Sequence, residues 1–302
     1  MTDKQKKKQA SERAQRISKV KHDRKYILSQ KSSFYQQEAY RALRTNVNFA
    51  LANTEGCKVV MVTSALQGEG KSLTALNLAI SLGQADKKVL LIDCDMRRPR
   101  LARLLNLSAP AGLSNMLMDM GLLEMAIINN EEHGIDLILA GDIPPNPAEL
   151  LSSGRMKKLL EHTKEQYDYV IIDSPPVDLV VDAVALSALC DGVLFVVRAN
   201  HSERGAVVYG MEQLQYAGAN VMGFVFNGVT SKTTRGYGKY RYRSYARHGY
   251  GKYSRFGYRY GYGYGRRGYG YGYGYGYGYG NPGHPVVPID MSRVAKEADK
   301  QS

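Results

Sequence analysis

Residues 65–72 place two glycines, a lysine and a serine in a spacing that suits anion binding. The segment reads Ala-Leu-Gln-Gly-Glu-Gly-Lys-Ser and lies between a short apolar run ending at Thr63 and a helical pattern. Glycines let the backbone curl so that its N–H groups face a phosphate, the lysine reaches the terminal phosphates, and the serine hydroxyl can bind magnesium. The pattern predicts a P-loop for ATP and Mg²⁺, formed by Gln67, Gly68, Glu69, Gly70, Lys71, Ser72 and Leu73.

A plain glycine turn between a strand and a helix is the alternative for this segment. Ala65 stands where the motif usually has its first glycine, which makes the pattern less specific when it is taken alone. The Lys-Ser pair and the strand and helix patterns on either side favour the phosphate site.

Aspartates end two further apolar runs. Asp93 and Asp95 follow the run 90–92, and Asp173 follows the run 169–172. Because ligands gather at the carboxyl ends of strands in an open parallel sheet, we expect these side chains to lie beside the P-loop. Carboxylates in that place can bind Mg²⁺ or accept a proton. Without a P-loop, helix caps or turn residues would be the better interpretation.

The elements that must position these residues alternate along the chain. Short β-branched runs predict strands and apolar periodicities predict helices, at residues 59–62, 72–84, 89–92, 135–139, 147–163, 169–172, 192–197, 202–216 and 221–226. Apolar strands separated by helices indicate a parallel sheet that is covered on both faces. The predicted fold class is therefore α/β, a doubly wound and mainly parallel sheet of the P-loop NTPase type.

The net charge of +13 over 302 residues is concentrated at the two ends of the chain. Residues 1–31 hold eleven Lys/Arg against three Asp/Glu, residues 232–280 hold eleven and no acid, and residues 281–302 balance at three each. The remaining residues, 32–231, carry a net charge of −6. This pattern predicts a basic flexible arm (1–31), an acidic ATP-binding domain (32–231), a disordered tail (232–280) and a polar C-terminal segment (281–302).

Cysteine usage and hydropathy bear on the compartment. The three cysteines, Cys57, Cys94 and Cys190, are too few and too scattered for a disulfide framework or a zinc site, which fits a reducing cytoplasm. No uncharged apolar stretch is long enough to cross a membrane, so we expect any membrane attachment to come through a partner.

The tail has an unusual composition. Sixteen of the 23 tyrosines lie between Tyr237 and Tyr279, and Tyr and Gly alternate without a break over residues 269–280. Alternate glycines carry a large backbone entropy cost and offer no side chain to pack, which predicts a disordered and solvated segment. A low-complexity linker, or an adhesive segment that binds RNA or another anionic polymer through arginine and stacking, is the plainer interpretation.

Several segments together resemble the bacterial tyrosine kinase family. The resemblance covers roughly residues 34–231 and rests on these matches: Glu-Ala-Tyr-Arg-Ala-Leu-Arg-Thr-Asn (38–46), Gly-Glu-Gly-Lys-Ser (68–72), Asp-Cys-Asp-Met-Arg-Arg-Pro (93–99), Pro-Pro-Asn-Pro-Ala-Glu-Leu (144–150) and Ile-Asp-Ser-Pro-Pro (172–176). The chain is most similar to the single-chain cytoplasmic form that accompanies capsular or exopolysaccharide synthesis in Gram-positive bacteria. Gln67 departs from the family, which often has proline there.

The resemblance implies a role for each site residue. Lys71 would contact the β- and γ-phosphates, Ser72 and Asp173 would hold Mg²⁺, Asp95 would orient the metal shell, and Asp93 would accept the proton of a tyrosine hydroxyl. The acceptors would be tail tyrosines: Tyr269, Tyr271, Tyr273, Tyr275, Tyr277 and Tyr279.

Asn227 follows the last predicted strand. In related ATPases of the broader superfamily, an asparagine in such a place reads adenine, and Asn227 looks similar. A loop residue that caps backbone groups is the equal alternative.

The resemblance also implies partners. Glu38, Arg41 and Arg44 lie three residues apart, which puts them on one face of a helix. In the family this pattern builds a ring of subunits, and a solvated helix face is the plainer reading. The family further implies a membrane activator of the polysaccharide chain-length-regulator type, which recruits the cytoplasmic kinase to the inner face of the membrane, and a cognate phosphotyrosine phosphatase. No DNA partner is expected.

A nucleotide-switched positioning or scaffold ATPase is the competing function. Positioning ATPases of this superfamily carry a lysine where this chain has Leu66. Its absence, the pair Asp93 and Asp95, and the tyrosine tail favour the kinase.

Overall fold

A computed structural model describes residues 22–178 and 182–229 of the chain. The predictions made for residues 1–21, for the tail and for the C-terminal segment fall outside this range. All structural statements below concern the described residues.

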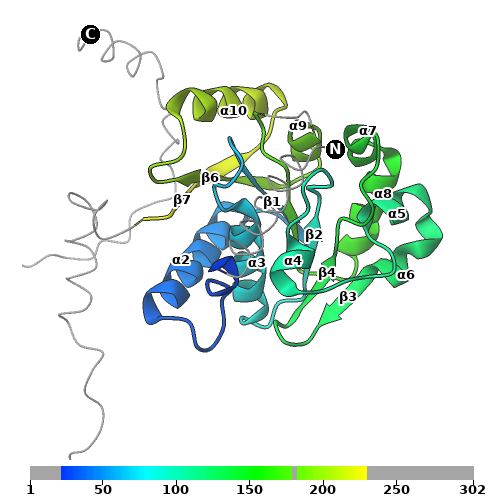
Figure 1. The fold of residues 1–302 in the computed structure, drawn as a ribbon, viewed down its shortest axis with the longest axis horizontal. Coiled ribbons are helices and arrows are strands. Elements are labelled where there is room, and N and C mark those ends of the chain that lie inside the picture. The colour runs from blue at the N-terminus through cyan, green and yellow to red at the C-terminus, as the bar shows by residue number, and fades with distance from the viewer. Residues whose placement is uncertain (1–21, 179–181, 230–302) are drawn as a thin grey trace, which may run out of the picture. The chain divides into compact units, whose positions relative to one another are not determined.

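A seven-stranded sheet forms the centre of the described chain (Figure 1). The strand order is β3-β4-β2-β5-β1-β6-β7, and every neighbouring pair is parallel except the antiparallel pair of β3 and β4. The strands are β1 (Lys58–Ser64), β2 (Val89–Asp93), β3 (Ile127–Asn130), β4 (Ile135–Ile138), β5 (Tyr169–Asp173), β6 (Gly192–Arg198) and β7 (Val221–Asn227). The predicted fold class is confirmed.

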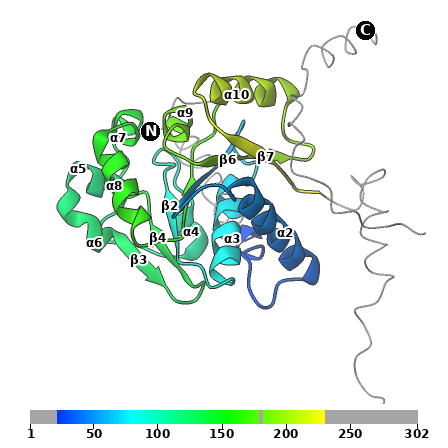
Figure 2. The ribbon, with the colours of Figure 1, turned by 180° about the vertical axis from the view of Figure 1, so that it is seen from behind.

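Helices cover both faces of the sheet, and the two opposite views show α2 beside α3 and α7 beside α8 (Figures 1 and 2). The longer helices are α2 (Phe34–Ala50), α3 (Lys71–Gly83), α8 (Gly154–Lys164) and α10 (Arg204–Tyr216). The shorter ones are α4 (Leu101–Leu105), α5 (Leu113–Met118), η1 (Met120–Leu122), α6 (Leu123–Ala126), α7 (Pro147–Leu151) and α9 (Asp182–Ser187).

Alternate residues of each central strand enter opposite cores. On β1, Val60 and Val62 pack in the cluster that includes α2, α3 and α4, whereas Val59 and Met61 pack in the cluster that includes α5, α7, α8, α9 and α10. Because both faces are buried, the central strands are continuous apolar runs in the sequence.

One predicted helix is wrong in its extent. The pattern over residues 147–163 predicted a single helix, but the structure has α7 and α8 with a break between them. Ser153 causes the break because its hydroxyl accepts a hydrogen bond from the Met156 amide, 3.3 Å away, and caps α8. The antiparallel strand β3 and the short helices other than α7 were not predicted.

The folded part begins before the predicted boundary at residue 32. Leu28 is only 2 % exposed, and its amide donates to Asn77 Oδ1 of α3 over 2.8 Å. The predicted flexible arm, residues 1–31, therefore extends too far, because residues in the range 22–31 pack on the folded domain. No helix in the described ranges is long and apolar enough to cross a bilayer.

Candidate active site

The P-loop connects the end of β1 to the start of α3. Gly68 and Gly70 have φ angles of 84° and 99°, in the left-handed region that glycine adopts without strain. A Cβ atom on Gly70 would also collide with the side chain of Asn227. The backbone angle therefore favours glycine at both positions, and the close contact with Asn227 leaves no room for a side chain at Gly70. The next residue, Lys71, begins α3.

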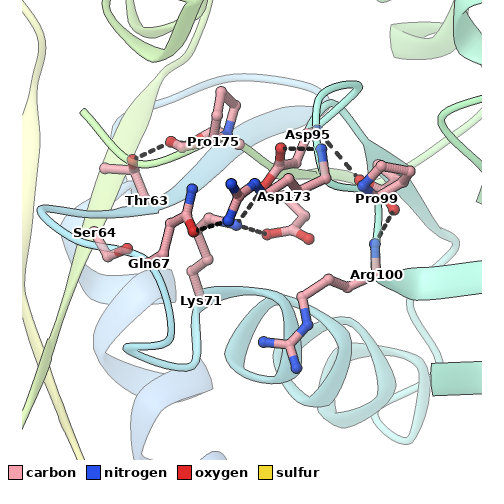
Figure 3. Close-up of polar contacts among 12 residues, drawn as sticks. Thr63, Ser64, Gln67, Lys71, Asp95, Pro99, Arg100, Asp173 and Pro175 are labelled. Atoms are coloured by element: carbon pink, nitrogen blue, oxygen red, sulfur yellow. Dashed lines mark hydrogen bonds and ion pairs between the residues drawn. The ribbon is translucent and has the colours of Figure 1, made fainter. Parts of the chain in front are cut away.

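The three sheet positions predicted to meet the P-loop do so. Strand β5 lies between β1 and β2, and Asp93 and Asp173 are register partners at their carboxyl ends. Lys71 Nζ lies 2.8 Å from Asp95 Oδ2 and 4.0 Å from Asp173 Oδ1, as Figure 3 shows. These side chains are almost completely buried. The carboxyl edge of the sheet thus brings one ammonium group and several carboxylates together.

The charges change one another's titration. Burial alone would lower the pKa of Lys71, but the Asp173 and Asp95 carboxylates outweigh it and the pKa is raised. Burial raises the pKa of Asp173 to about 6, against the opposing effect of Lys71. Lys71 therefore stays charged at neutral pH in the midst of the acids.

Ser72 and Asp173 have the properties of an incomplete magnesium site. The Ser72 hydroxyl and both Asp173 oxygens are buried, and none has a partner with full hydrogen-bond geometry within the part of the chain that the structure describes. Ser72 is nevertheless close enough to Asp173 to oppose the rise in the pKa of that carboxyl. Buried polar atoms without partners are costly, so such a pair points to a ligand that supplies the missing contacts. A hydroxyl and a carboxylate are hard oxygen ligands of the kind that Mg²⁺ takes.

These residues alone do not make a complete metal cage. In residues 22–178 and 182–229, no group of three or more His, Cys, Asp or Glu side chains is arranged to hold an ion. Mg²⁺ commonly binds through one or two protein oxygens, with substrate phosphates and water completing the shell. The residues therefore fit an ion that arrives with a nucleotide. Asp95, which was also predicted to serve the metal, here contacts Lys71.

Asp93 is held by backbone amides. Its Oδ2 accepts from the amides of Arg100 and Leu101 over 3.2 and 3.1 Å, and its Oδ1 accepts from the Asp95 amide over 3.2 Å. Burial and then the neighbouring Asp173 raise the pKa of Asp93 to about 8. A fixed carboxylate with a pKa near neutrality suits a general base.

The other side of the P-loop is held by a loop that the sequence interpretation missed. Arg198 donates to the Gly68 carbonyl over 2.6 Å, and the His201 ring lies 2.9 Å from the Gln67 carbonyl. The Ser202 hydroxyl donates to the Glu69 carboxylate. Arg198 ends β6 at the same sheet edge as the aspartates, so the strand-end argument applied to those acids also applies to it.

Some predicted cofactor residues serve the loop itself. The Glu69 carboxylate, fully buried, accepts from the Leu66 amide over 2.8 Å as well as from Ser202, so its side chain points into the protein. Gln67 accepts a hydrogen bond from Arg98. Leu73 is half-buried in the first turn of α3.

Asn227 lies at the P-loop. Its Nδ2 donates to the Glu69 carbonyl over 3.0 Å, and its side chain abuts Gly70. Both the adenine role and the plain backbone-capping role predicted for Asn227 agree with this position.

The three residues predicted to contact another subunit are not equivalent on α2. Arg41 and Glu38 form an exposed ion pair with an N–O distance of 2.7 Å. Arg44 instead donates to the Ser81 carbonyl of α3, which binds α2 to the body of the domain. The tail tyrosines predicted as acceptors lie outside the described residues.

The fold and the P-loop at the carboxyl edge of the sheet define a P-loop nucleotide-binding protein. Comparisons with known proteins identify its family. A family model described as an AAA domain matches residues 57–217. Tyrosine-protein kinase YwqD of Bacillus subtilis (strain 168) is 40% identical over 203 residues, which cover 67% of this chain and 85% of YwqD. The solved kinase domain of Escherichia coli tyrosine kinase ETK is 38% identical with a TM-score of 0.63, over 67% of this chain and 79% of that domain. The chain belongs to the bacterial tyrosine-protein kinases.

The relatives differ greatly in length. This chain spans 85% of YwqD but only 27% of tyrosine-protein kinase etk of Escherichia coli (strain K12). The matched family model, over residues 57–217, contains the P-loop and the three aspartates but not Asn227.

Proposed function

We propose that this kinase transfers the γ-phosphoryl group of ATP to tyrosines of its own Gly/Tyr-rich tail, between neighbouring subunits. The observation that carries the proposal is the pair of orphaned groups, the Ser72 hydroxyl and the Asp173 carboxylate, beside the buried ammonium of Lys71. A magnesium-bound triphosphate would supply the contacts that these groups lack.

The residues of the edge divide the reaction between them. Lys71 would exchange its contact with Asp95 for the terminal phosphates, and Ser72 and Asp173 would hold magnesium, which would neutralise charge on the phosphates. The tyrosine oxygen forms a bond to the γ-phosphorus as the bond from that phosphorus to the bridging oxygen of ADP breaks. The hydroxyl proton passes to Asp93. A carboxylate has about four lone-pair sites, so the three amide bonds of Asp93 leave one acceptor position.

The tail suits the role of substrate. A tyrosine hydroxyl has a pKa near 10 and is a poor nucleophile at neutral pH, so positioning and local concentration must do much of the catalysis. The many tyrosines of residues 232–280 supply concentration, and their eleven cationic residues favour approach to the acidic body. Tyr269, Tyr271, Tyr273, Tyr275, Tyr277 and Tyr279 are the proposed acceptors.

Phosphorylation would then regulate assembly. Each phosphotyrosine adds about −1.5 to −2 charges, so roughly six to seven of them cancel the positive charge of the tail. Beyond that point tail and body repel each other, and a ring of subunits loosens. The exposed Glu38–Arg41 pair is the proposed ring contact, while Arg44 supports it by fixing α2 to α3.

The resemblance to kinases that accompany capsular or exopolysaccharide synthesis supports a role in that process. We propose a cytoplasmic kinase that regulates capsular or exopolysaccharide synthesis, is recruited and activated by a membrane protein of the chain-length-regulator type, and is reset by a phosphotyrosine phosphatase. The proposed domain limits are those predicted from the sequence, except that the folded domain begins by residue 22.

The test is the intact mass of the full chain after incubation with Mg-ATP, with and without the cytoplasmic segment of the activator. The matched variants are Lys71→Met and a variant with all six proposed acceptor tyrosines changed to Phe. We expect mass increments of about 80 Da per phosphate that need Lys71 and map to the tail. ATP hydrolysis without phosphotyrosine, with the activator present, would instead support a scaffold ATPase.

A second experiment mixes two variants of the chain to test whether phosphate is transferred between subunits. Lys71→Met chains with an intact tail are incubated with active chains whose acceptor tyrosines are Phe. Phosphate on the Lys71→Met chains supports transfer between subunits, and its absence contradicts it.

A further inference from the structure

We propose that residues 22–28 form a strap that positions the loop carrying Asp93 and Asp95, and that Asp23 is the positioning residue of this strap. The effect on catalysis rests on the proposed role of Asp93 as proton acceptor. The mechanical connection does not, because it is made by contacts between described residues.

The strap is fixed to α3 at one end. The amide of Leu28 donates to Asn77 Oδ1, and Asn77 Nδ2 donates back to the Tyr26 carbonyl, each over 2.8 Å. Leu28 is 2 % exposed and Asn77 is 1 % exposed, so the first hydrogen bond is shielded from water, whereas the second, to the more exposed Tyr26, is partly shielded. Gln36 of α2 also donates to the Tyr26 carbonyl, over 2.6 Å. Buried, paired contacts of this kind make the anchor rigid.

The other end of the strap holds α4. Asp23 Oδ2 lies 2.9 Å from Arg100 Nη2, in an ion pair whose side chains are 23% and 26% exposed. Arg24 donates from Nη2 to the Arg103 carbonyl over 2.6 Å and from Nη2 to Asn106 Oδ1 over 3.3 Å. The strap thus contacts the residue before α4, a residue within it and the residue after it.

Arg100 joins the strap to the catalytic carboxylate. Its side chain pairs with Asp23, and its backbone amide donates to Asp93 Oδ2 over 3.2 Å. The adjacent Leu101 amide donates to the same oxygen over 3.1 Å. One residue therefore separates the strap from the proposed proton acceptor.

Helix α4 needs such external support. It has five residues, far fewer than an isolated helix requires for stability in water, so tertiary contacts decide where its first amides lie. These amides fix the orientation of the Asp93 carboxylate. A shift of α4 would therefore turn the carboxylate away from the acceptor tyrosine, and misplacement on the scale of an ångström is costly for catalysis.

Nucleotide binding uses different elements. The phosphate groups contact the P-loop and the start of α3, whereas the strap acts on the segment that follows β2. We therefore expect loss of the Asp23–Arg100 pair to lower kcat while the KM for ATP stays within about twofold. Because partial unfolding would also lower the apparent kcat at constant KM, kcat is calculated per folded protein.

The experiment uses the full chain with three variants. Asp23→Asn removes the charge of the pair, Asp23→Glu retains it, and Glu161→Gln is the control because it removes the carboxylate of an exposed pair with Lys157 on α8. The first readout is hydrogen exchange of the amides of Arg100 and Leu101 without nucleotide. The second is kcat and KM for tyrosine phosphorylation with Mg-ATP.

We expect Asp23→Asn to speed exchange of these two amides by about two- to fivefold and to lower kcat by a similar factor, with Asp23→Glu restoring most of both and Glu161→Gln changing neither. Unchanged exchange in Asp23→Asn would overturn the strap itself. Faster exchange with unchanged kcat would overturn its catalytic role. An inactive wild type in the presence of the activator segment, with faster exchange in Asp23→Asn, would refute the proposed function and leave the strap supported.

Discussion

The two sides of the P-loop are built in opposite ways. Toward β2 and β5, Lys71 lies among buried carboxylates, and Ser72 and Asp173 keep polar atoms without partners in the described structure. Toward β6 and β7, the loop is fully braced by polar contacts from Arg198, His201, Ser202 and Asn227. We call these the open side and the braced side.

This difference means that the braced side contributes to the stability of the free protein, whereas the open side contributes to ligand binding. On the braced side the protein satisfies its own polar groups, so those contacts stabilise the loop before any ligand arrives. On the open side Lys71 offsets only part of the desolvation of Asp173, since burial still raises the pKa of that carboxyl, so this group destabilises the free protein and gains from a ligand. Mutations on the two sides should therefore have opposite signatures.

The largest expected effect is on the open side. Lys71→Met removes the cation that contacts the terminal phosphates, and we expect phosphotransfer to fall by at least about 10²- to 10³-fold. The measurement is the initial rate of phosphotyrosine formation with saturating Mg-ATP. A variant that retained a tenth of the rate would place the chemistry elsewhere.

On the braced side, Glu69→Ala should chiefly lower stability. The change leaves the partly buried Leu66 amide and Ser202 hydroxyl without their acceptor, which costs about 1–3 kcal/mol in the free energy of unfolding. Urea unfolding without nucleotide measures it, with Glu161→Ala as the exposed control. An unfolding free energy equal to that of the control would show that the brace does not support the fold.

Asp173→Asn should do the reverse, abolishing activity while raising the stability of the nucleotide-free protein by about 1 kcal/mol. Lys71 keeps Asp95 as its partner, and a buried carboxylate without hydrogen bonds is removed.

The stability gain from Asp173→Asn should depend on pH. Because folding raises the pKa of Asp173 to about 6 from about 4, ionisation of this group favours the unfolded chain. The gain should be small near pH 4, grow as the pH rises and level off above about pH 6. Urea unfolding at several pH values measures the difference in unfolding free energy from wild type. A gain that shrank with rising pH would contradict the claim that the ionised Asp173 carboxylate destabilises the nucleotide-free protein.

The smallest effect is expected from Ser202→Ala. Loss of one hydrogen bond to Glu69 should cost about 0.5–1.5 kcal/mol of stability, because the Leu66 contact of the same carboxylate remains. Thermal unfolding measures it. A double variant with Glu69→Ala should be less than additive, because the two residues share one contact, and full additivity would show that they act independently.

The open side could be predicted from the sequence, whereas on the braced side only Asn227 was singled out. Lys71, Asp93 and Asp173 directly follow apolar strands or precede a helix, so local patterns place them at one edge of the sheet. The contact of Ser202 with Glu69 joins residues 133 positions apart, and no local pattern encodes such a pairing.

The limits of the fold prediction have similar causes. The seven-residue and five-residue apolar strands were predicted, but β3 was missed. Two of its four residues are asparagines, and it lies at the sheet edge, where the apolar pattern is weak. The packing of Leu28 on α3 was missed because one apolar residue in a basic segment gives no periodic signal.

The most direct test of the account is the magnesium dependence of nucleotide binding by the full chain. Calorimetry with a non-hydrolysable ATP analogue would compare wild type and Asp173→Asn, each with magnesium and with EDTA. We predict that magnesium tightens binding to wild type at least about tenfold and changes binding to Asp173→Asn by less than about twofold, since metal-site losses are typically of this size. Equal magnesium dependence in both proteins would contradict the claim that the unpartnered groups of the open side hold Mg-ATP.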